Sequence, residues 1–214
     1  MKKIFASLLA ASMMLVAFNA NAQLSAGAGY LNSTLSGQAN GNAIDPVASN
    51  GFFAGASFNL ALPVSGLSLN PGAYVSFISN TEKNSVGTGS LTQNTKSTFS
   101  EIALNVPVHV NYAYELAGDT KVFAFAGPTF ALGLSSKTRT VLTGLVESDD
   151  TRDHYAKNDY NNFNLYLGGG LGAEVSGIII KVGYDFGLLN LYKGDSSDTN
   201  YKRSNLYIGV GYAF

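Results

Sequence analysis

The sequence predicts an all-β protein, an eight-stranded antiparallel up-and-down transmembrane β-barrel, and three observations support this fold class. Eight segments alternate apolar residues with small or polar ones, and a period of two is that of a β-strand. The connections between these segments are alternately long and short. Within the segments, the charged residues all fall on the strand face opposite to the apolar residues, as expected where one face of each strand meets lipid.

The composition agrees with a barrel in a membrane. Only 13% of the 214 residues are charged, about half the usual share of a soluble domain, whereas the chain has 24 Gly, 12 Tyr and 13 Phe. After residue 22 no apolar run reaches about 18 residues, so we expect no membrane-spanning helix there. The 14 acidic residues outnumber the 13 basic ones, so nucleic acid is not an expected partner.

The first 22 residues have the pattern of a secretory signal peptide. An apolar stretch follows Lys2 and Lys3, and Ala20-Asn21-Ala22 fits the small-residue pattern of a cleavage site. We therefore expect cleavage between Ala22 and Gln23. The alternative interpretation is an ordinary N-terminal helix.

The mature chain, residues 23–214, is expected to form one barrel domain. Its eight strands are expected at about residues 24–32, 51–62, 67–78, 99–114, 120–134, 163–175, 178–189 and 203–214. Polar loops rich in Asn, Gly, Ser and charge fill the four long connections, and the three short ones carry turn residues such as Ser176-Gly177.

The apolar pattern also predicts strand register. In the second hairpin, Leu60 should lie opposite Leu69 and Phe52 opposite Phe77, so that apolar residues meet across the two strands. Pro71 has no N–H for this ladder, and a β-bulge would relieve the cost. In the next hairpin Glu115 should lie opposite Lys121 as a cross-strand ion pair.

An even number of strands places both termini on the side of the short turns, which is periplasmic in an outer-membrane barrel, and places the long loops outside the cell. The C-terminal residues Tyr212-Ala213-Phe214 look like a signal for the outer-membrane assembly machinery, with Tyr212 and Phe214 as its aromatic residues. The expected location is therefore the cell outer membrane. Outer-membrane lipid and the assembly machinery are the expected partners, together with an unknown extracellular ligand or protein.

Five polar residues fall on the strand faces that are expected to point into the barrel: Glu101, His109, Glu174, Lys181 and Asp185. Eight strands leave an interior that side chains just fill, so we expect an ion-pair and hydrogen-bond network that plugs the barrel. The alternative is a polar path for ions or protons. No catalytic residue, cofactor or metal site is expected, because neither His109 nor His154 has neighbours with ligand spacing.

A second feature of the interior parity is the glycine-rich run at residues 168–172. It does not open a helix, so it fails the context of a phosphate-binding loop. We expect these small residues to make room for Tyr side chains inside the barrel.

Several segments resemble a known family. Val106-Pro107-Val108 before a short turn, Gly127-Pro128 on the next strand, YLGGGLGAEV (166–175) and VGYDFGLLNLY (182–192) look like the outer-membrane β-barrel domain common in Bacteroidota. That broad group includes the PorT-like proteins. The resemblance implies an eight-stranded barrel and supplies no catalytic residue.

We therefore expect a non-enzymatic protein with a membrane-structural or surface-interaction role, carried by its long extracellular loops. Two alternatives stay open at this point. One is a small transport pore or a component of a secretion system, and the other is a lipid-modifying outer-membrane enzyme. Fold alone does not separate these functions.

Overall fold

The computed structural model describes residues 22–87, 92–116, 118–144, 146–194 and 198–214. The expected signal peptide lies outside these ranges except for its last residue, Ala22, where the first strand begins. Within the described ranges, no helix is long and apolar enough to cross a membrane.

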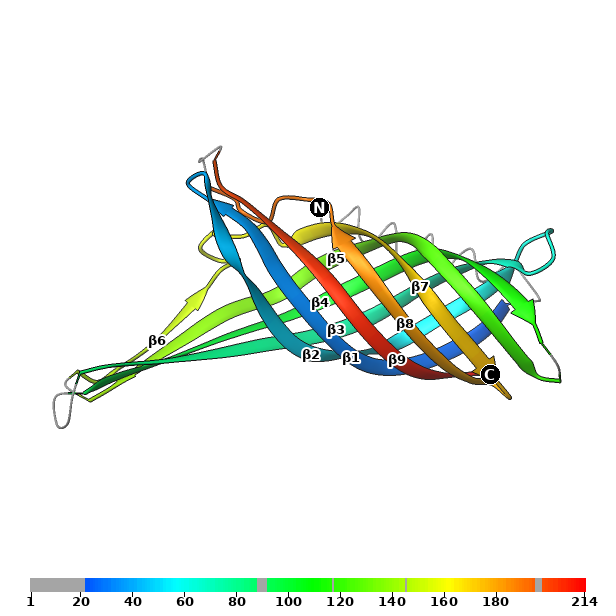
Figure 1. The fold of residues 1–214 in the computed structure, drawn as a ribbon, viewed down its shortest axis with the longest axis horizontal. Helices are drawn as coiled ribbons and strands as arrows, with labels where there is room; N and C mark the ends of the chain where they lie inside the picture. The colour runs from blue at the N-terminus through cyan, green and yellow to red at the C-terminus, as the bar shows by residue number, and fades with distance from the viewer. Residues whose placement is uncertain (1–21, 88–91, 117, 145, 195–197) are drawn as a thin grey trace.

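The described chain is an antiparallel sheet of nine strands that closes into a ring (Figure 1). Their bounds are Ala22–Ala39 (β1), Asn42–Ala61 (β2), Leu67–Val86 (β3), Gln93–Glu115 (β4), Thr120–Thr143 (β5), Ser148–Asp153 (β6), Phe163–Val175 (β7), Ile178–Gly187 (β8) and Asn200–Ala213 (β9). Neighbouring strands pair in the order β4-β3-β2-β1-β9-β8-β7-β5-β6, and a further β4–β5 pairing closes the ring. Strand β6 lies outside the ring, because it pairs only with β5.

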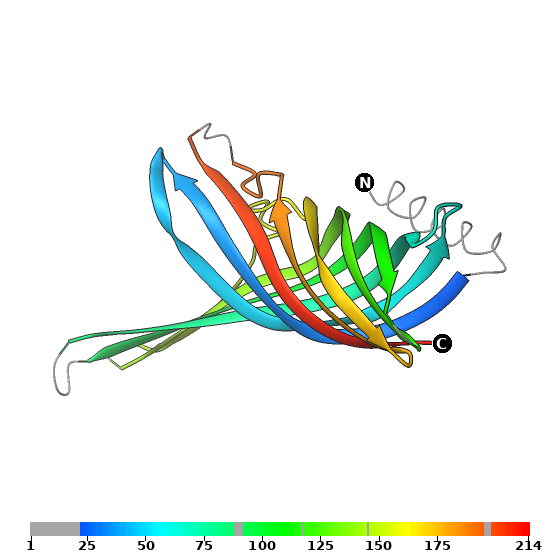
Figure 2. The same ribbon diagram turned by 45° about the vertical axis from the view of Figure 1, so that its right-hand side comes forward.

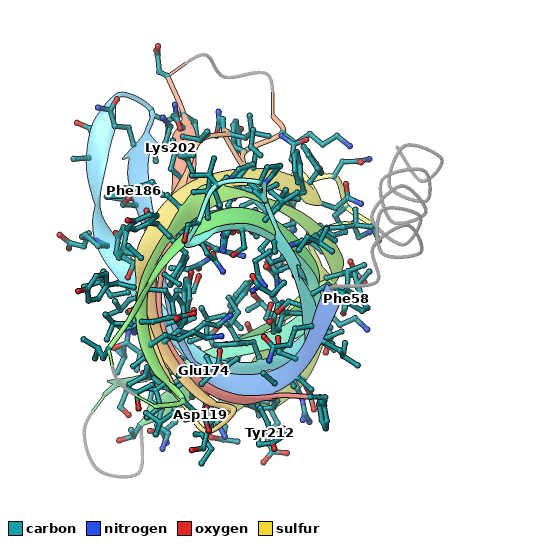
Figure 3. All side chains as sticks on the ribbon, turned by 90° about the vertical axis from the view of Figure 1, so that its right-hand side faces the viewer. Phe58, Asp119, Glu174, Phe186, Lys202 and Tyr212 are labelled. Carbon is teal, nitrogen blue, oxygen red and sulfur yellow. The ribbon has the colours of Figure 1, made fainter. Side chains whose placement is uncertain are left out.

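The outer surface of the ring is apolar, as the alternation predicts. On β8, Ile180, Val182 and Phe186 are exposed on the outside, whereas Asp185 between them is buried. Figure 3, which looks along the barrel from the end with the short turns, shows side chains both outside the ring and within it. A strand with one apolar and one polar face suits a wall with lipid on one side.

The expected register of the second hairpin is confirmed, but the expected bulge at Pro71 is not. Leu60 pairs with Leu69 and Phe52 with Phe77, with no register shift between β2 and β3. The side-chain Nδ2 of Asn70 instead donates a hydrogen bond of 2.9 Å to the carbonyl oxygen of Phe58. This bond supplies a donor that Pro71 lacks, so the ladder keeps its register.

The long polar connections contain much more strand than the sequence predicts. β1 and β2 meet at a turn around Asn40, and β3, β4 and β5 continue far beyond the expected ends near residues 78, 99 and 134. Apolar alternation ends where contact with lipid ends, but backbone pairing continues in water through Ser, Thr and Asn. The additional strand, β6, also comes from the third of these connections.

Four of these extensions form one structure, which we call the arm: residues 80–86, 93–100, 137–143 and 148–153, from β3, β4, β5 and β6. The pairing of β3 with β2 ends at Ser79, so β3 has a free edge in the arm. Figures 1 and 2 show the arm projecting beyond the barrel at the end opposite to the C-terminus.

The last strand closes the ring against the first. β9 pairs with β1 from Ser25–Ala213 to Gln38–Asn200, and the backbone N–H of Phe214 donates to the carbonyl oxygen of Leu24 at 2.8 Å. The ring of Phe214 is 72% exposed and lies 5.2 Å, between centroids, from that of Tyr212. Both aromatic residues are therefore accessible on the outside of the closing strand.

We predict that Phe214→Asp reduces assembly into the outer membrane far more than Ala213→Ser does. A carboxylate at residue 214 places a charge on the outer apolar face, whereas Ala213 is buried on the inner face and Ser is small enough to replace it. The measurement is the fraction of protein that shifts mobility on heating in a detergent gel. Equal fractions for both variants would show that this end is a strand without a signal.

Candidate functional site

An aromatic belt crosses the middle of the barrel interior. Its members come from five strands of the ring: Phe53, Tyr74, His109, Phe125 and Tyr207. The ring of Phe53 lies edge-on to Tyr74 at 5.8 Å and to Tyr207 at 6.0 Å, and His109 stacks on Phe125 at 5.2 Å. The expected plug of ion pairs and hydrogen bonds is therefore mainly aromatic at this level.

The glycine-rich run on β7 makes room for this belt, with one correction to the expectation. A Cβ on Gly170 would lie 2.7 Å from the ring of Phe125, and one on Gly172 would lie 2.2 Å from the ring of Phe123. A Cβ on Gly168 would lie 1.8 Å from a carboxylate oxygen of Asp185. The neighbours that need the space are thus Phe and Asp side chains, and not Tyr.

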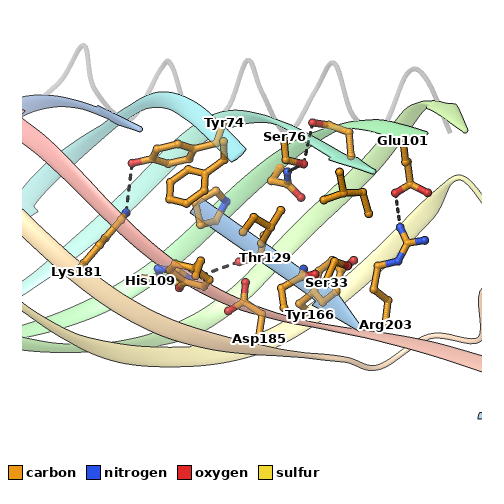
Figure 4. Close-up of a pocket in the computed structure, with 18 residues that line it drawn as sticks. Ser33, Tyr74, Ser76, Glu101, His109, Thr129, Tyr166, Lys181, Asp185 and Arg203 are labelled. Atoms are coloured by element: carbon orange, nitrogen blue, oxygen red, sulfur yellow. Dashed lines mark hydrogen bonds and ion pairs between the residues drawn. The ribbon is translucent and has the colours of Figure 1, made fainter. Parts of the chain in front are cut away.

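The belt separates two cavities. A cavity of about 80 Å³, which we call the middle cavity, lies on the side of the arm (Figure 4). A second cavity, of about 90 Å³, opens toward the short turns. Phe53, Tyr74, His109 and Lys181 line both cavities and so form the partition between them.

A buried ion pair forms a second partition, between the middle cavity and a mouth cavity of about 20 Å³. Arg203 on β9 donates to the carboxylate of Glu101 on β4, and both side chains are less than 10% exposed. Tyr166 lines both cavities beside this pair. Sequence reasoning missed Arg203, although it has the same parity as the inward residues Asn205 and Tyr207 and could have been found that way.

The five residues expected to form one network occupy separate levels of the barrel. Glu174 binds Lys121 at 3.0 Å near the short turns, so Lys121 does not form the expected ion pair with Glu115, although the two are register partners. Lys181 Nζ lies 3.5 Å from the hydroxyl of Tyr74 and 4.9 Å from its ring centroid.

Of the other three residues, His109 lies in the belt itself, and Glu101 and Asp185 lie on its arm side. His109 Nε2 lies 3.4 Å from the hydroxyl of Thr129. Glu101 pairs with Arg203, as described above. Asp185 is 6% exposed, and its Oδ1 has no hydrogen-bond partner among the described residues.

A chain of hydrogen bonds, which we call the mouth latch, holds the segment after β6 across the arm end of the barrel. Nε2 of His154 lies 2.8 Å from Thr138 Oγ1, and its Nδ1 lies 3.1 Å from Asp159 Oδ2. Arg152 donates two hydrogen bonds of 2.6 Å to the Asp159 carboxylate. The sequence placed these charged residues in a polar loop, and only the fold of the segment brings the four residues together.

The hydrogen bond from Arg152 lowers the pKa of Asp159 from 3.8 to about 2, with a smaller contribution from the hydrogen bond to His154. A lowered pKa means that the ionised form is favoured in the folded protein. The contribution of Asp159 to the latch is therefore complete above its ordinary pKa and is lost as pH falls through about 2.

We predict that Glu101→Gln destabilises the barrel by about 3–5 kcal/mol, because the variant leaves the buried guanidinium of Arg203 without its counter-charge. The matched variant Glu174→Gln breaks the Lys121 pair, in which Lys121 is 28% exposed, and should cost at most about 1 kcal/mol. Urea unfolding in detergent micelles measures both. An equal cost for the two variants would contradict the assignment of Glu101–Arg203 as the buried partition.

Solved structures similar to this chain include several outer-membrane proteins. A major outer membrane protein from Thermus thermophilus is 16% identical, with a TM-score of 0.47 over 90% of this chain and 99% of that one. The attachment invasion locus protein Ail of Yersinia pestis, in complex with the heparin analogue sucrose octasulfate, is 12% identical, with a TM-score of 0.45 over 90% and 99%. OprG from Pseudomonas aeruginosa is 8% identical, with a TM-score of 0.38 over 90% and 95%.

None of the curated proteins compared with this chain matches it. The family model described as "Outer membrane protein beta-barrel domain" matches residues 12–193, which is most of the chain. This match agrees with the closed antiparallel sheet and its apolar outer surface. The chain therefore belongs to the family of outer membrane protein β-barrel domains.

Proposed function

We propose that this outer-membrane barrel is a surface-interaction protein whose arm binds a partner protein outside the cell. The observation that supports the proposal is the arm itself: a four-stranded sheet that extends beyond the barrel and has no apolar core of its own to bury. This sheet lies beyond the ring and is not part of the barrel wall. Its shape suits contact with another macromolecule.

The arm is held in one shape by polar contacts between its strands. Arg139 and Asp149 form a double hydrogen bond across β5 and β6, at 2.9 and 2.5 Å. Gln93 exchanges two hydrogen bonds of 2.9 Å with the backbone of Val146 at the β5–β6 connection. A surface that is already ordered loses little conformational entropy when a partner binds.

Both edges of the arm are open. Residues 80–86 of β3 pair only with β4, and residues 148–153 of β6 pair only with β5. An open edge presents backbone N–H and C=O groups that an extended segment of another protein can pair with. Charged residues such as Lys83 and Asp150 restrict which segments fit, which is how natural edges avoid indiscriminate pairing.

The occluded interior makes the rival function of a transport pore less favourable. The aromatic belt and the Glu101–Arg203 pair narrow the lumen, and the cavities on the two sides of the belt hold only about 80 and 90 Å³. A role in a secretion system, suggested by the resemblance to the PorT-like barrels of Bacteroidota, is compatible with a partner-binding arm. In this proposal eight strands cross the membrane, the termini are periplasmic and residues 1–22 are removed.

A single-cysteine experiment tests orientation and partner binding together, because the natural chain has no Cys. Asn84→Cys places a thiol on the free β3 edge of the arm. We predict that a membrane-impermeant maleimide carrying a photoactivatable benzophenone labels it on intact cells. Irradiation should then produce a defined cross-linked protein, which mass spectrometry identifies.

The matched control is Asp119→Cys, which is exposed at the β4–β5 turn on the opposite end of the barrel. It should remain unlabelled until the cells are opened. Labelling of residue 119 on intact cells would reverse the proposed orientation. Labelling of residue 84 without any cross-linked protein would contradict the binding role of the arm.

The mouth latch favours a second candidate function, an acyl hydrolase. Thr138, His154 and Asp159 are joined in the order nucleophile, base and orienting acid, at distances of 2.8 and 3.1 Å. In this reaction Thr138 Oγ1 attacks an ester carbonyl while His154 accepts its proton and gives it to the leaving alcohol. A water molecule, deprotonated by His154, then attacks the acyl-threonine, which releases the acid and restores Thr138. The same contacts equally serve to hold the latch closed.

Hydrolysis of p-nitrophenyl acetate by the refolded protein separates the two roles of the latch. If the triad is catalytic, Thr138→Ala and His154→Gln should each lower the rate at least 100-fold. Thr140→Ala, on the same strand two residues away, is the matched control and should leave the rate unchanged. A rate that is the same in all four proteins would leave the latch with a structural role alone.

A further inference from the structure

We propose that the middle cavity is a binding site for a small primary ammonium ion, such as a short alkylamine. Three oxygen atoms in its wall support this: Oδ1 of Asp185, Oδ1 of Asn205 and Oγ of Ser33. These residues are 6%, 9% and 2% exposed, and none of the three atoms has a hydrogen-bond partner among the described residues. Buried oxygen atoms of this kind are costly unless a donor satisfies them.

The three residues form one row across three neighbouring strands. Asp185 on β8 is the register partner of Asn205 on β9, and Asn205 is the partner of Ser33 on β1. All three line the middle cavity. Figure 4 shows Asp185 and Ser33 on the same side of the cavity, with the Glu101–Arg203 pair at one end. An ammonium group has three donors, and this row offers three oxygen atoms.

One acidic group of the cavity, Asp185, has no basic group in direct contact. Glu101 is paired with Arg203, and Lys181 contacts Tyr74. Asp185 has no basic group within 4.0 Å among the described residues, and the charge of Lys181, which lines the same cavity, acts on its carboxylate only from a greater distance. An ammonium ion would give the Asp185 carboxylate a hydrogen bond and a positive charge in direct contact, whereas water would give the hydrogen bond alone.

The wall that faces this row fits a small apolar body. Ile78 on β3 and Ala103 on β4 are buried and line the cavity from the strands that lie opposite β8 and β9 in the ring. The polar groups nearby are already paired, since Asn105 donates to Ser76 at 2.8 Å. The cavity holds about 80 Å³, whereas a cavity of about 150 Å³ admits benzene, so the solute should have only a few carbon atoms.

The test uses the full mature chain, refolded from urea into detergent micelles so that solutes can enter while the barrel closes. Propylammonium chloride should raise the midpoint of thermal unfolding in a saturable way. Propanol and sodium chloride at the same concentration should not, because one lacks the charge and the other lacks the three donors. Hexylammonium should bind at least tenfold more weakly, because its chain exceeds the cavity.

Two variants connect the effect to the site. Asp185→Asn keeps the shape of the side chain and removes its charge, and it should weaken the apparent affinity for propylammonium at least tenfold. Asp119→Asn, an exposed acid at the β4–β5 turn, is the matched control and should bind as the natural chain does. Equal affinities in these two variants, or equal stabilisation by propanol, sodium and propylammonium, would overturn the proposal. The natural chain's selectivity tests it even if Asp185→Asn does not fold.

Discussion

Closure of the sheet is the constraint on which the rest of the structure depends. Once β1 pairs with β9 and β4 with β5, every inward side chain of the ring must share one narrow lumen with those of the other strands. A narrow ring of strands leaves an interior that side chains largely fill. Large inward residues therefore require small ones opposite them, and charged inward residues require partners from distant parts of the chain. Packing therefore constrains which side chains can point inward, whatever their function.

Different kinds of side chain fill the lumen at different levels of the barrel. At the middle, rings such as Phe53 and Phe125 fill the lumen, and glycines on β7 give them room. Toward the arm, Glu101 and Arg203 neutralise one another. In the row of Asp185, Asn205 and Ser33 between these levels, three buried oxygen atoms that line one cavity lack a hydrogen-bond partner among the described residues, as do three other buried side-chain atoms elsewhere. Unpaired oxygen atoms that line a single cavity are where a binding role is worth testing.

Outside the membrane the same strands are under a different constraint. The arm has no lumen and no lipid, so its strands are held by backbone ladders and by polar contacts such as Arg139–Asp149. Such contacts between exposed groups contribute little stability one by one. The arm is therefore ordered mainly because three of its four strands continue from the barrel wall. The barrel fixes the position of the arm, and the free edges of β3 and β6 remain available to a partner.

Apolar alternation was enough to predict the antiparallel barrel, the two faces of its strands and the register of hairpins such as Phe52–Phe77, because it reports directly which side chains meet lipid. It did not determine where the strands end, since alternation stops at the membrane surface while pairing continues to Val86 and Thr143. It also missed the partners inside the ring. Parity places Glu101 and Arg203 inside, but they are 102 residues apart, and only the closed ring brings them together. The latch around His154 and the row at Asp185 depend on tertiary structure for the same reason.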